Sequence, residues 1–314
     1  MKVIVLVALI ALIGCGGNGT LGGITPIKPI ETRKLNFPEL EGVFLYGVSN
    51  DGRTIAGYAS DGTTRRPILM RDFVEADFTD SFEFDAILAL SPEGIHAVVY
   101  KIVEHGGGQY SVRNYLWRVG TWLGYFMFDG PVSNLRVADT GTVEGQCSSF
   151  VGFNFFTFAT PNRLYLSPDP PPDPFETPIP VGYSGKFVQG FSASKRAAFG
   201  RAMRSDGSMR PCIWLPNSAP NVIAEPPEND HVNCVWASDD GTRALVYVLQ
   251  EEQSQTYLWT KDRGYISMPE LAAKAGASAK DPKYWGLISR SANGRYFVLT
   301  HSLHLDEHYW VHVP

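Results

Sequence analysis

A short unit that recurs six times along the chain is the feature that most constrains the fold. Its best-formed copy, Gly47–Gly57 followed by Arg66–Met70, returns with the same glycine spacing at Gly190–Gly200, followed one residue later than in the first copy by Arg210–Trp214. The six copies can be marked by the turn glycine or its replacement: Gly52, Gly94, Gly141, Lys195, Gly241 and Gly294. These markers are 42 to 54 residues apart. Since a four-stranded propeller blade takes about 40–50 residues, the spacing predicts one blade per unit.

Each unit is organised as a strand, a tight turn, a strand, a loop, an aromatic-ended strand and a fourth strand. Runs such as Arg243–Tyr247 and Arg295–Leu299 are too short and too rich in β-branched or aromatic residues for helices. Only 19% of residues are charged and 12% are aromatic, which fits an all-β body. The sequence therefore predicts an all-β fold, a six-bladed β-propeller of four-stranded antiparallel blades.

The two ends of the chain predict how the ring closes. The last unit ends at Val311–Pro314 and leaves no residues for its own fourth strand. Arg33–Leu40 precedes the first unit and echoes Gly264–Leu271, the fourth-strand region of the fifth unit. Because unpaired strand edges are unfavourable, we expect the N-terminal strand at Arg33–Phe37 to complete the sixth blade.

These repeats resemble those of a known group of proteins. The Ser-x-Asp-Gly turn and the aromatic-ended strand, as in Ser238–Gly241 and Tyr257–Trp259, resemble TolB-type and HAF-type extracellular propeller repeats. The resemblance covers about Arg33–Pro314, and Lys195 and Thr140 depart from the pattern. It implies a binding or scaffolding module, which is an expectation about function and not a consequence of the fold.

The N-terminus predicts export. Val3–Ile13 is an uninterrupted apolar run after Lys2, a length that suits a signal peptide and is too short to span a bilayer. Leu12–Cys15 resembles a bacterial lipobox, which implies cleavage before Cys15 and a lipid on its sulfur. An ordinary signal peptide with an incidental Cys15 is the alternative. We expect a lipoprotein signal peptide at 1–14, the lipidated cysteine with a Gly-rich flexible tether at 15–32, and the propeller at 33–314.

Several further features bear on location and partners. Gly16 stands where many Gram-negative lipoproteins carry an inner-membrane retention Asp, so the resemblance implies the outer membrane, or the cell surface in other hosts. The net charge of −5 and the lack of a Lys/Arg cluster predict no nucleic-acid partner. Cys147, Cys212 and Cys234 allow one disulfide at most in an oxidising compartment, and its pairing is open.

The C-terminal segment carries the one candidate metal site. His304–His308 matches the H-x-x-E-H pattern of inverted zinc peptidases, but that chemistry requires a helix and this segment is predicted as extended chain. In an extended segment His304, Asp306 and His308 would lie on one side and could hold a metal ion. The alternative is a solvated loop, and no other cofactor is predicted.

The expected binding surface lies opposite the tight turns, where the longer loops gather. Ser167–Pro180 contains seven prolines and is expected to form a stiff, extended projection. Tyr165, Phe175, His304 and Glu307 are the candidate binding residues on this side. No nucleophile motif is present, since Gly182–Gly185 is not G-x-S-x-G.

Three functions follow from these features. The first is a membrane-anchored, non-enzymatic module that binds an envelope protein, peptide or glycan. The alternative is an extracytoplasmic hydrolase or lyase with its site at the propeller channel, and the third is a structural envelope protein.

Overall fold

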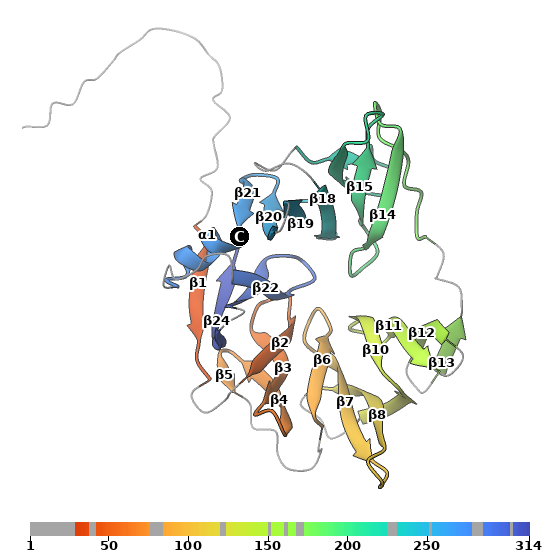
Figure 1. Cartoon of the computed structure of the whole chain (residues 1–314), viewed down its shortest axis with the longest axis vertical. Helices are drawn as coiled ribbons and strands as arrows, with labels where there is room; N and C mark the ends of the chain where they lie inside the picture. The colour runs from red at the N-terminus through yellow and green to blue at the C-terminus, as the bar shows by residue number, and fades with distance from the viewer. Residues whose placement is uncertain are drawn as a thin grey trace, which may run out of the picture.

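The chain forms six four-stranded antiparallel sheets arranged as a ring (Figure 1), so the predicted six-bladed β-propeller is confirmed. The computed structural model describes residues 29–37, 42–75, 84–119, 124–149, 152–159, 163–167, 173–224, 231–250, 253–277, 285–301 and 304–314. Within these ranges the one helix is α1 (Met268–Lys274). None of the helical structure in the described ranges is long and apolar enough to cross a membrane.

The blades follow one another along the chain, and in each the first strand lies innermost. Blade one contains β2 (Val43–Val48), β3 (Thr54–Ser60), β4 (Arg65–Arg71) and β5 (Val74–Glu75). Blade two contains β6 (Ala86–Leu90), β7 (His96–Glu104), β8 (Tyr110–Arg118) and β9 (Gly124–Asp129). Blade three contains β10 (Val132–Val137), β11 (Val143–Ser149), β12 (Gly152–Ala159) and β13 (Arg163–Ser167). Blade four contains β14 (Gly185–Phe191), β15 (Ala198–Met203), β16 (Met209–Trp214) and β17 (Asn221–Val222). Blade five contains β18 (His231–Ala237), β19 (Arg243–Gln250), β20 (Gln253–Thr260) and β21 (Gly264–Ser267).

Blade six joins the two ends of the chain. It contains β22 (Trp285–Arg290), β23 (Tyr296–His301), β24 (His304–His312) and the N-terminal strand β1 (Glu31–Leu35). β1 pairs antiparallel with β24, with Glu31 opposite His312 and Leu35 opposite His308 (Figure 1). The predicted closure by an N-terminal strand is therefore confirmed.

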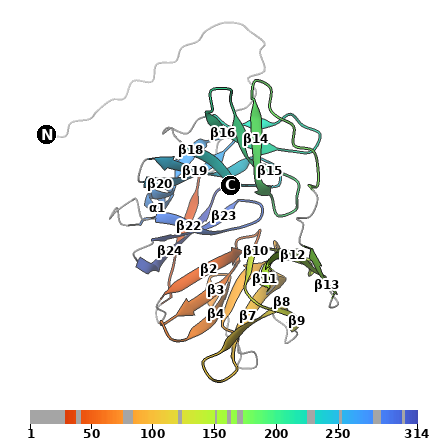
Figure 2. The same cartoon turned by 45° about the vertical axis from the view of Figure 1, so that its right-hand side comes forward.

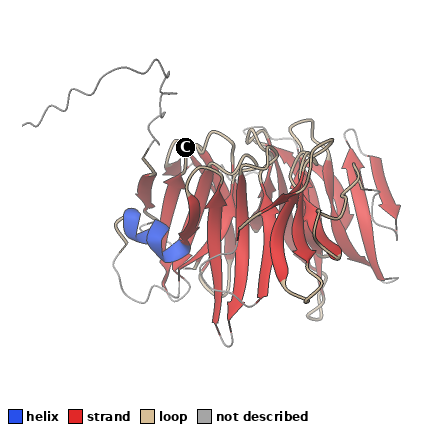
Figure 3. Ribbon diagram, turned by 90° about the horizontal axis from the view of Figure 1, so that it is seen from above, coloured by secondary structure: helices blue, strands red, loops and turns tan. Residues whose placement is uncertain are grey.

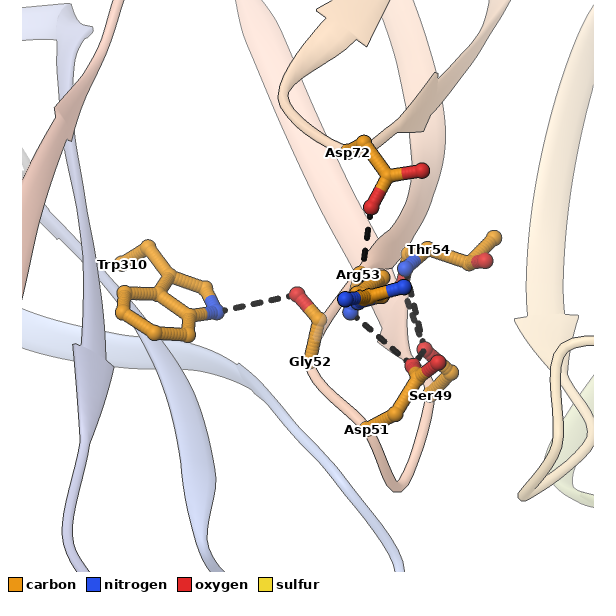
Figure 4. A network of polar contacts seen from close by, with 7 residues as sticks. All are labelled: Ser49, Asp51, Gly52, Arg53, Thr54, Asp72 and Trp310. Carbon is orange, nitrogen blue, oxygen red and sulfur yellow. Dashed lines mark hydrogen bonds and ion pairs between the residues drawn. The ribbon is translucent and has the colours of Figure 1, made fainter.

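The strands run between two faces of the ring (Figure 3), and the six tight turns define one of them, called here the turn face. In each turn the marker residue donates its backbone N–H to the carbonyl three residues earlier and has a φ between 56° and 81°. Ser49 begins the turn of blade one. Its buried Oγ accepts the N–H of Thr54 at 2.9 Å and donates to Asp51 at 2.5 Å (Figure 4). The Ser-x-Asp-Gly sequence is thus explained as turn chemistry.

Side chains of the turns also join alternate pairs of blades. A carboxylate or amide oxygen two residues before the marker accepts the N–H of the preceding blade's turn. The acceptors are Asn50, Asp139 and Asp239, and the donors are Asn293, Glu93 and Ser194, at 2.9 to 3.0 Å. Pro92, Ala193 and Ala292 stand at the acceptor position of the other three blades. Around the ring, turns with an Asn or Asp acceptor thus alternate with turns that have Pro or Ala at that position.

The packing between blades three and four differs from that of the other neighbours. The other five neighbouring pairs share apolar cores, whereas the face of blade four that is turned away from blade five packs against residues of the segment 173–184. Phe175 contacts Phe191 edge to face at 5.7 Å, and Trp214 Nε1 donates to the carbonyl of Pro178 at 2.8 Å. The expected projection at Ser167–Pro180 is therefore wrong for the described part, which lies along blade four before β14 begins (Figure 2).

Lys195 links blade four to blade three on the turn face. It stands where the other turns have glycine and adopts a φ of 56°, which costs a side-chain-bearing residue about 1–2 kcal/mol. Its Nζ lies 2.8 Å from Oε1 of Glu144 on β11. The departure from the repeat thus supplies an ion pair across the two blades that share no apolar core among the described side chains.

The three cysteines of the propeller are buried thiols. Cys147, Cys212 and Cys234 are all free. Burial raises the pKa of Cys212 and of Cys234 to about 12, so both stay protonated at neutral pH. The sequence allowed at most one disulfide among these three residues, and the structure contains none between them.

Candidate functional site at the inner rim

The innermost strands share an irregularity that shapes one end of the ring. Each of β2, β6, β10, β14, β18 and β22 carries a register shift partway along its pairing with the next strand. Such bulges bend a strand and redirect its side chains. The strand ends beyond these bulges, on the face opposite the turns, are called here the inner rim, and that face the loop face.

Equivalent positions of the repeats meet at the inner rim. In five blades one residue of the innermost strand lies opposite one residue of its neighbour, at the same distances from the turn marker. These pairs are Phe44–Tyr58, Ala86–Tyr100, Phe187–Arg201, Asn233–Tyr247 and Gly286–Thr300. Directly opposed residues share a face of the sheet. The rim is therefore aromatic at blades one, two, four and five, and has small or hydroxylated residues at blade six.

Blades one and two form the first ring-and-guanidinium site, called here rim site A. Tyr58 stacks on Phe44 at 4.9 Å and on Tyr46 at 5.8 Å. The guanidinium of Arg65 lies 5.3 Å from the centre of the Tyr58 ring and donates to the hydroxyl of Tyr100 on blade two. Tyr46, on the innermost strand, remains 46% exposed. Rim site A therefore presents an aromatic surface beside a fixed positive charge.

The electrostatics of rim site A keep its groups in defined protonation states. Burial, and then a hydrogen bond with Tyr58, raises the pKa of Tyr46 to about 12. The hydrogen bond to Tyr100 is the main cause that raises the pKa of the Arg65 guanidinium above its usual value. At neutral pH the tyrosine is therefore a neutral hydroxyl, and the arginine carries a full charge.

Blade four, opposite blade one in the ring, forms the second site, called here rim site B. The guanidinium of Arg201 lies 5.0 Å from the centre of the Phe187 ring, which is 50% exposed. Gln189 occupies the position in β14 that Tyr46 occupies in β2. Its Oε1 accepts a hydrogen bond from Nδ2 of Asn233 on blade five at 3.2 Å. Rim site B thus repeats the ring-and-guanidinium arrangement and adds two side-chain amides.

Two glycines let the backbone reach these positions. A Cβ on Gly57 would lie 1.9 Å from the carbonyl oxygen of Phe44, and one on Gly200 would lie 2.1 Å from that of Phe187. Both distances are far below a van der Waals contact. In the two blades whose rim residue is phenylalanine, the backbone carbonyl of that phenylalanine thus lies in the space that a Cβ of the facing glycine would occupy.

The sequence-predicted binding residues lie elsewhere. Tyr165 is on β13, and its side chain is outside the described residues. Phe175 packs on Phe191 beside the core of blade four, so its ring serves packing. His304 and Glu307 lie on β24, where the Glu307 side chain is partly exposed and that of His304 is outside the described residues. Their role in binding stays a prediction.

The candidate metal site falls on the same strand. His304–His312 is extended, so the requirement of a zinc peptidase for a helix is not met. His308 is fully buried, with Nδ1 2.7 Å from Thr300 Oγ1 and its ring edge to face with Phe37. Among the side chains that can be described, no three His, Cys, Asp or Glu residues form a group able to hold a metal ion. Since the Asp306 side chain is not among them, a metal ion at His304, Asp306 and His308 stays a prediction.

The rim residues escaped the sequence analysis, although the repeats contained a signal for them. Phe44 and Tyr58 flank the first unit just as Phe187 and Arg201 flank the fourth. Comparing the flanks of the two best copies would have shown the shared phenylalanine and its partner.

Comparison with known proteins concerns architecture. No protein-family model matches the chain, and no curated protein matches its sequence. Among solved structures, TolB from Acinetobacter baumannii is 12% identical, with a TM-score of 0.40 over 71% of this chain and 53% of that chain. The present chain therefore spans about half the length of TolB. The β-propeller domain of the Trilobed protease from Pyrococcus furiosus is 11% identical, with a TM-score of 0.40 over 83% and 80% of the two chains. Oligogalacturonate lyase from Vibrio parahaemolyticus is 8% identical, with a TM-score of 0.37 over 92% and 98%. TolB structures are thus among those similar to this chain, while the likeness to HAF-type repeats stays a prediction.

Proposed function

We propose that this chain is an exported, lipid-anchored binding module that holds its ligand at the inner rim of the loop face. The observation that carries this proposal is that blades one and four each combine an exposed aromatic ring, Tyr46 or Phe187, with a guanidinium that lies over a ring of the same blade. Large rings with a few oriented polar groups are typical of binding surfaces. The ligand is a protein, peptide or glycan of the cell envelope. The hydrolase or lyase alternative stays a prediction of the sequence.

The course of the N-terminal strand supports the anchored orientation. Glu31 lies opposite His312, which in turn lies opposite Tyr296, next to the turn of blade six. The chain therefore enters the propeller on the turn face. A lipid on Cys15 would hold that face toward the membrane through the Gly-rich tether, and the inner rim would point away from it.

The anchor predicts a simple change in fractionation. Replacing Cys15 by Ala removes the acceptor sulfur, so we expect the protein to move from the membrane pellet to the soluble extracytoplasmic fraction and to lose label from radioactive palmitate. Cys147→Ala, which changes a buried thiol of the propeller, is the matched control and should keep both the label and the pellet location. Membrane location and label that persist in the Cys15 variant would refute lipid attachment at this residue.

The rim predicts where a ligand touches the protein. A photo-crosslinking residue at exposed Gln189, installed in the full chain in intact cells, is expected to form an adduct with the ligand. Tyr46→Ala combined with Phe187→Ala should reduce that adduct about tenfold or more, because both exposed rings are lost. The same crosslinker at exposed Arg53, on the turn face, is the control. Equal adducts from both positions, or no effect of the ring substitutions, would refute binding at the rim.

A further inference from the structure

We propose that the ligand of the inner rim is an acidic polysaccharide that spans rim sites A and B. This inference rests on the proposed binding function and adds the chemical class of the ligand. It is carried by three observations: the type of side chain at the rim, the charge that these side chains hold, and their arrangement around the ring.

The rings provide flat platforms. An aromatic face carries partial negative charge, and the C–H groups on one side of a sugar ring carry partial positive charge, so the two stack favourably. Tyr46 is 46% exposed and Phe187 is 50% exposed, and each is steadied by a neighbour within its own site. Rim sites A and B can therefore each seat one sugar ring.

The guanidinia provide the selectivity for acids. Arg65 is oriented by the ring of Tyr58 and by its bond to Tyr100, and Arg201 by the ring of Phe187. A guanidinium has five N–H donors in one plane and matches a carboxylate in a bidentate manner. Contact with an aromatic ring does not use the N–H donors, so both guanidinia retain donors that can bind a carboxylate or sulfate on the sugar.

The remaining rim groups favour a sugar chain over a peptide. The rim pairs of blades one, two, four and five combine aromatic rings with a guanidinium and an amide, and contain no Leu, Ile, Val or Met. Gln189 and Asn233 instead supply amides, which bond to each other at 3.2 Å, and Gln189 is exposed. Amides can donate to and accept from neighbouring sugar hydroxyls.

The arrangement of the two sites points to a polymer. Blades one and four are half a turn apart in a ring of six, so one small sugar cannot occupy both sites. At blade six the rim residue is Gly286, and a Cβ built there meets no atom of the described residues within 4 Å. The rim therefore has aromatic side chains on two opposite sides and a glycine at blade six, where a chain can leave it.

The test is direct binding of defined polymers. The purified full chain in detergent, immobilised for biolayer interferometry, is exposed to alginate, polygalacturonate, hyaluronate and heparin, and then to neutral dextran and to polyglutamate. We expect at least one acidic polysaccharide to bind, with dextran and polyglutamate at least tenfold weaker. Arg65→Gln combined with Arg201→Gln should weaken that binding about 10- to 100-fold. Arg53→Gln is the matched control, since its exposed guanidinium lies on the turn face beside Asp72.

Each other outcome overturns the inference in a distinguishable way. Equal binding of polyglutamate would assign the rim to acidic chains in general, and equal binding of dextran would remove the role of the guanidinia. If no acidic polysaccharide binds while the Gln189 adduct still forms, the ligand class is wrong and the binding function stands. If both fail, the proposed function fails as well. Thermal unfolding of the arginine variants shows whether a lost signal reflects a lost fold.

Discussion

Replacing Leu35 by Ala is expected to lower the free energy of unfolding by about 2–5 kcal/mol. Leu35 is 1% exposed and packs with Phe37 and Val298 in the core that blades six and one share. The strand that carries it joins the two ends of the chain, so a cavity here weakens the closure of the ring as well as the local packing. Urea unfolding followed by tryptophan fluorescence measures the change through the midpoint and slope.

The matched control lies next to it on the same strand. Lys34 is exposed and pairs with Tyr309 through the backbone, which a substitution leaves intact. Lys34→Ala should therefore change the free energy of unfolding by no more than about 0.5 kcal/mol. Equal midpoints for the two variants would mean that β1 contributes nothing to holding the ring closed.

This closure could be predicted because it follows from counting strands. Each repeat supplies four strands, and the last repeat ends at Val311–Pro314 with only three. The fourth strand of that blade is β1, which comes from the extended segment before the first unit. β1 begins at Glu31, slightly before the predicted boundary at 33. The tight turns could be predicted equally well, because the positive φ at each marker position favours glycine, and Lys195 is the one marker that is not glycine.

The helix α1 shows where the repeat pattern misled. Gly264–Leu271 is the fourth-strand region of the fifth unit, and it contains the strand Gly264–Ser267 followed by the start of α1. Ser267 then caps the helix by accepting the N–H of Glu270 at 3.2 Å, and Glu270 pairs with Lys274 at 2.7 Å. These are ordinary helix-start signals. They were outweighed by the similarity to Arg33–Leu40, whose described part is also a strand up to Leu35.

The rim could not be predicted in the same way, because it depends on register. Phe44 and Tyr58 become neighbours only after β2 and β3 pair, and a bulge decides which side chains share a face. The C-terminal histidines were predicted to form a metal site because they are close together in the sequence. One of them, His308, instead faces Thr300 and Phe37 in the interior. Residues that are close along the chain can therefore point to different sides of the sheet.

The glycine beneath rim site A connects the fold to the proposed function, and Gly57→Ala is expected to cost about 3 kcal/mol in free energy of unfolding. The new Cβ would lie 1.9 Å from the carbonyl oxygen of Phe44 and 2.8 Å from Cα of Leu45. Both are backbone atoms of β2, so the conflict cannot be relieved by rotating a side chain. The strand must move, and Phe44 and Tyr46 must move with it. We therefore also expect weaker formation of the ligand adduct at the rim in the folded fraction.

Gly286→Ala separates this effect from the general consequences of removing a glycine. Gly286 holds the equivalent rim position in blade six and has no positive φ, and a Cβ there would meet no atom of the described residues within 4 Å. Because Ala restricts the unfolded chain, Gly286→Ala should leave the protein unchanged or stabilise it by about 0.4–1 kcal/mol. Urea midpoints of both variants and of Gly200→Ala, which should behave like Gly57→Ala, decide the matter. If Gly57→Ala unfolds at the same urea concentration as Gly286→Ala, the close approach of β2 to β3 does not fix the rim, and the aromatic platforms must be held by their side-chain contacts alone.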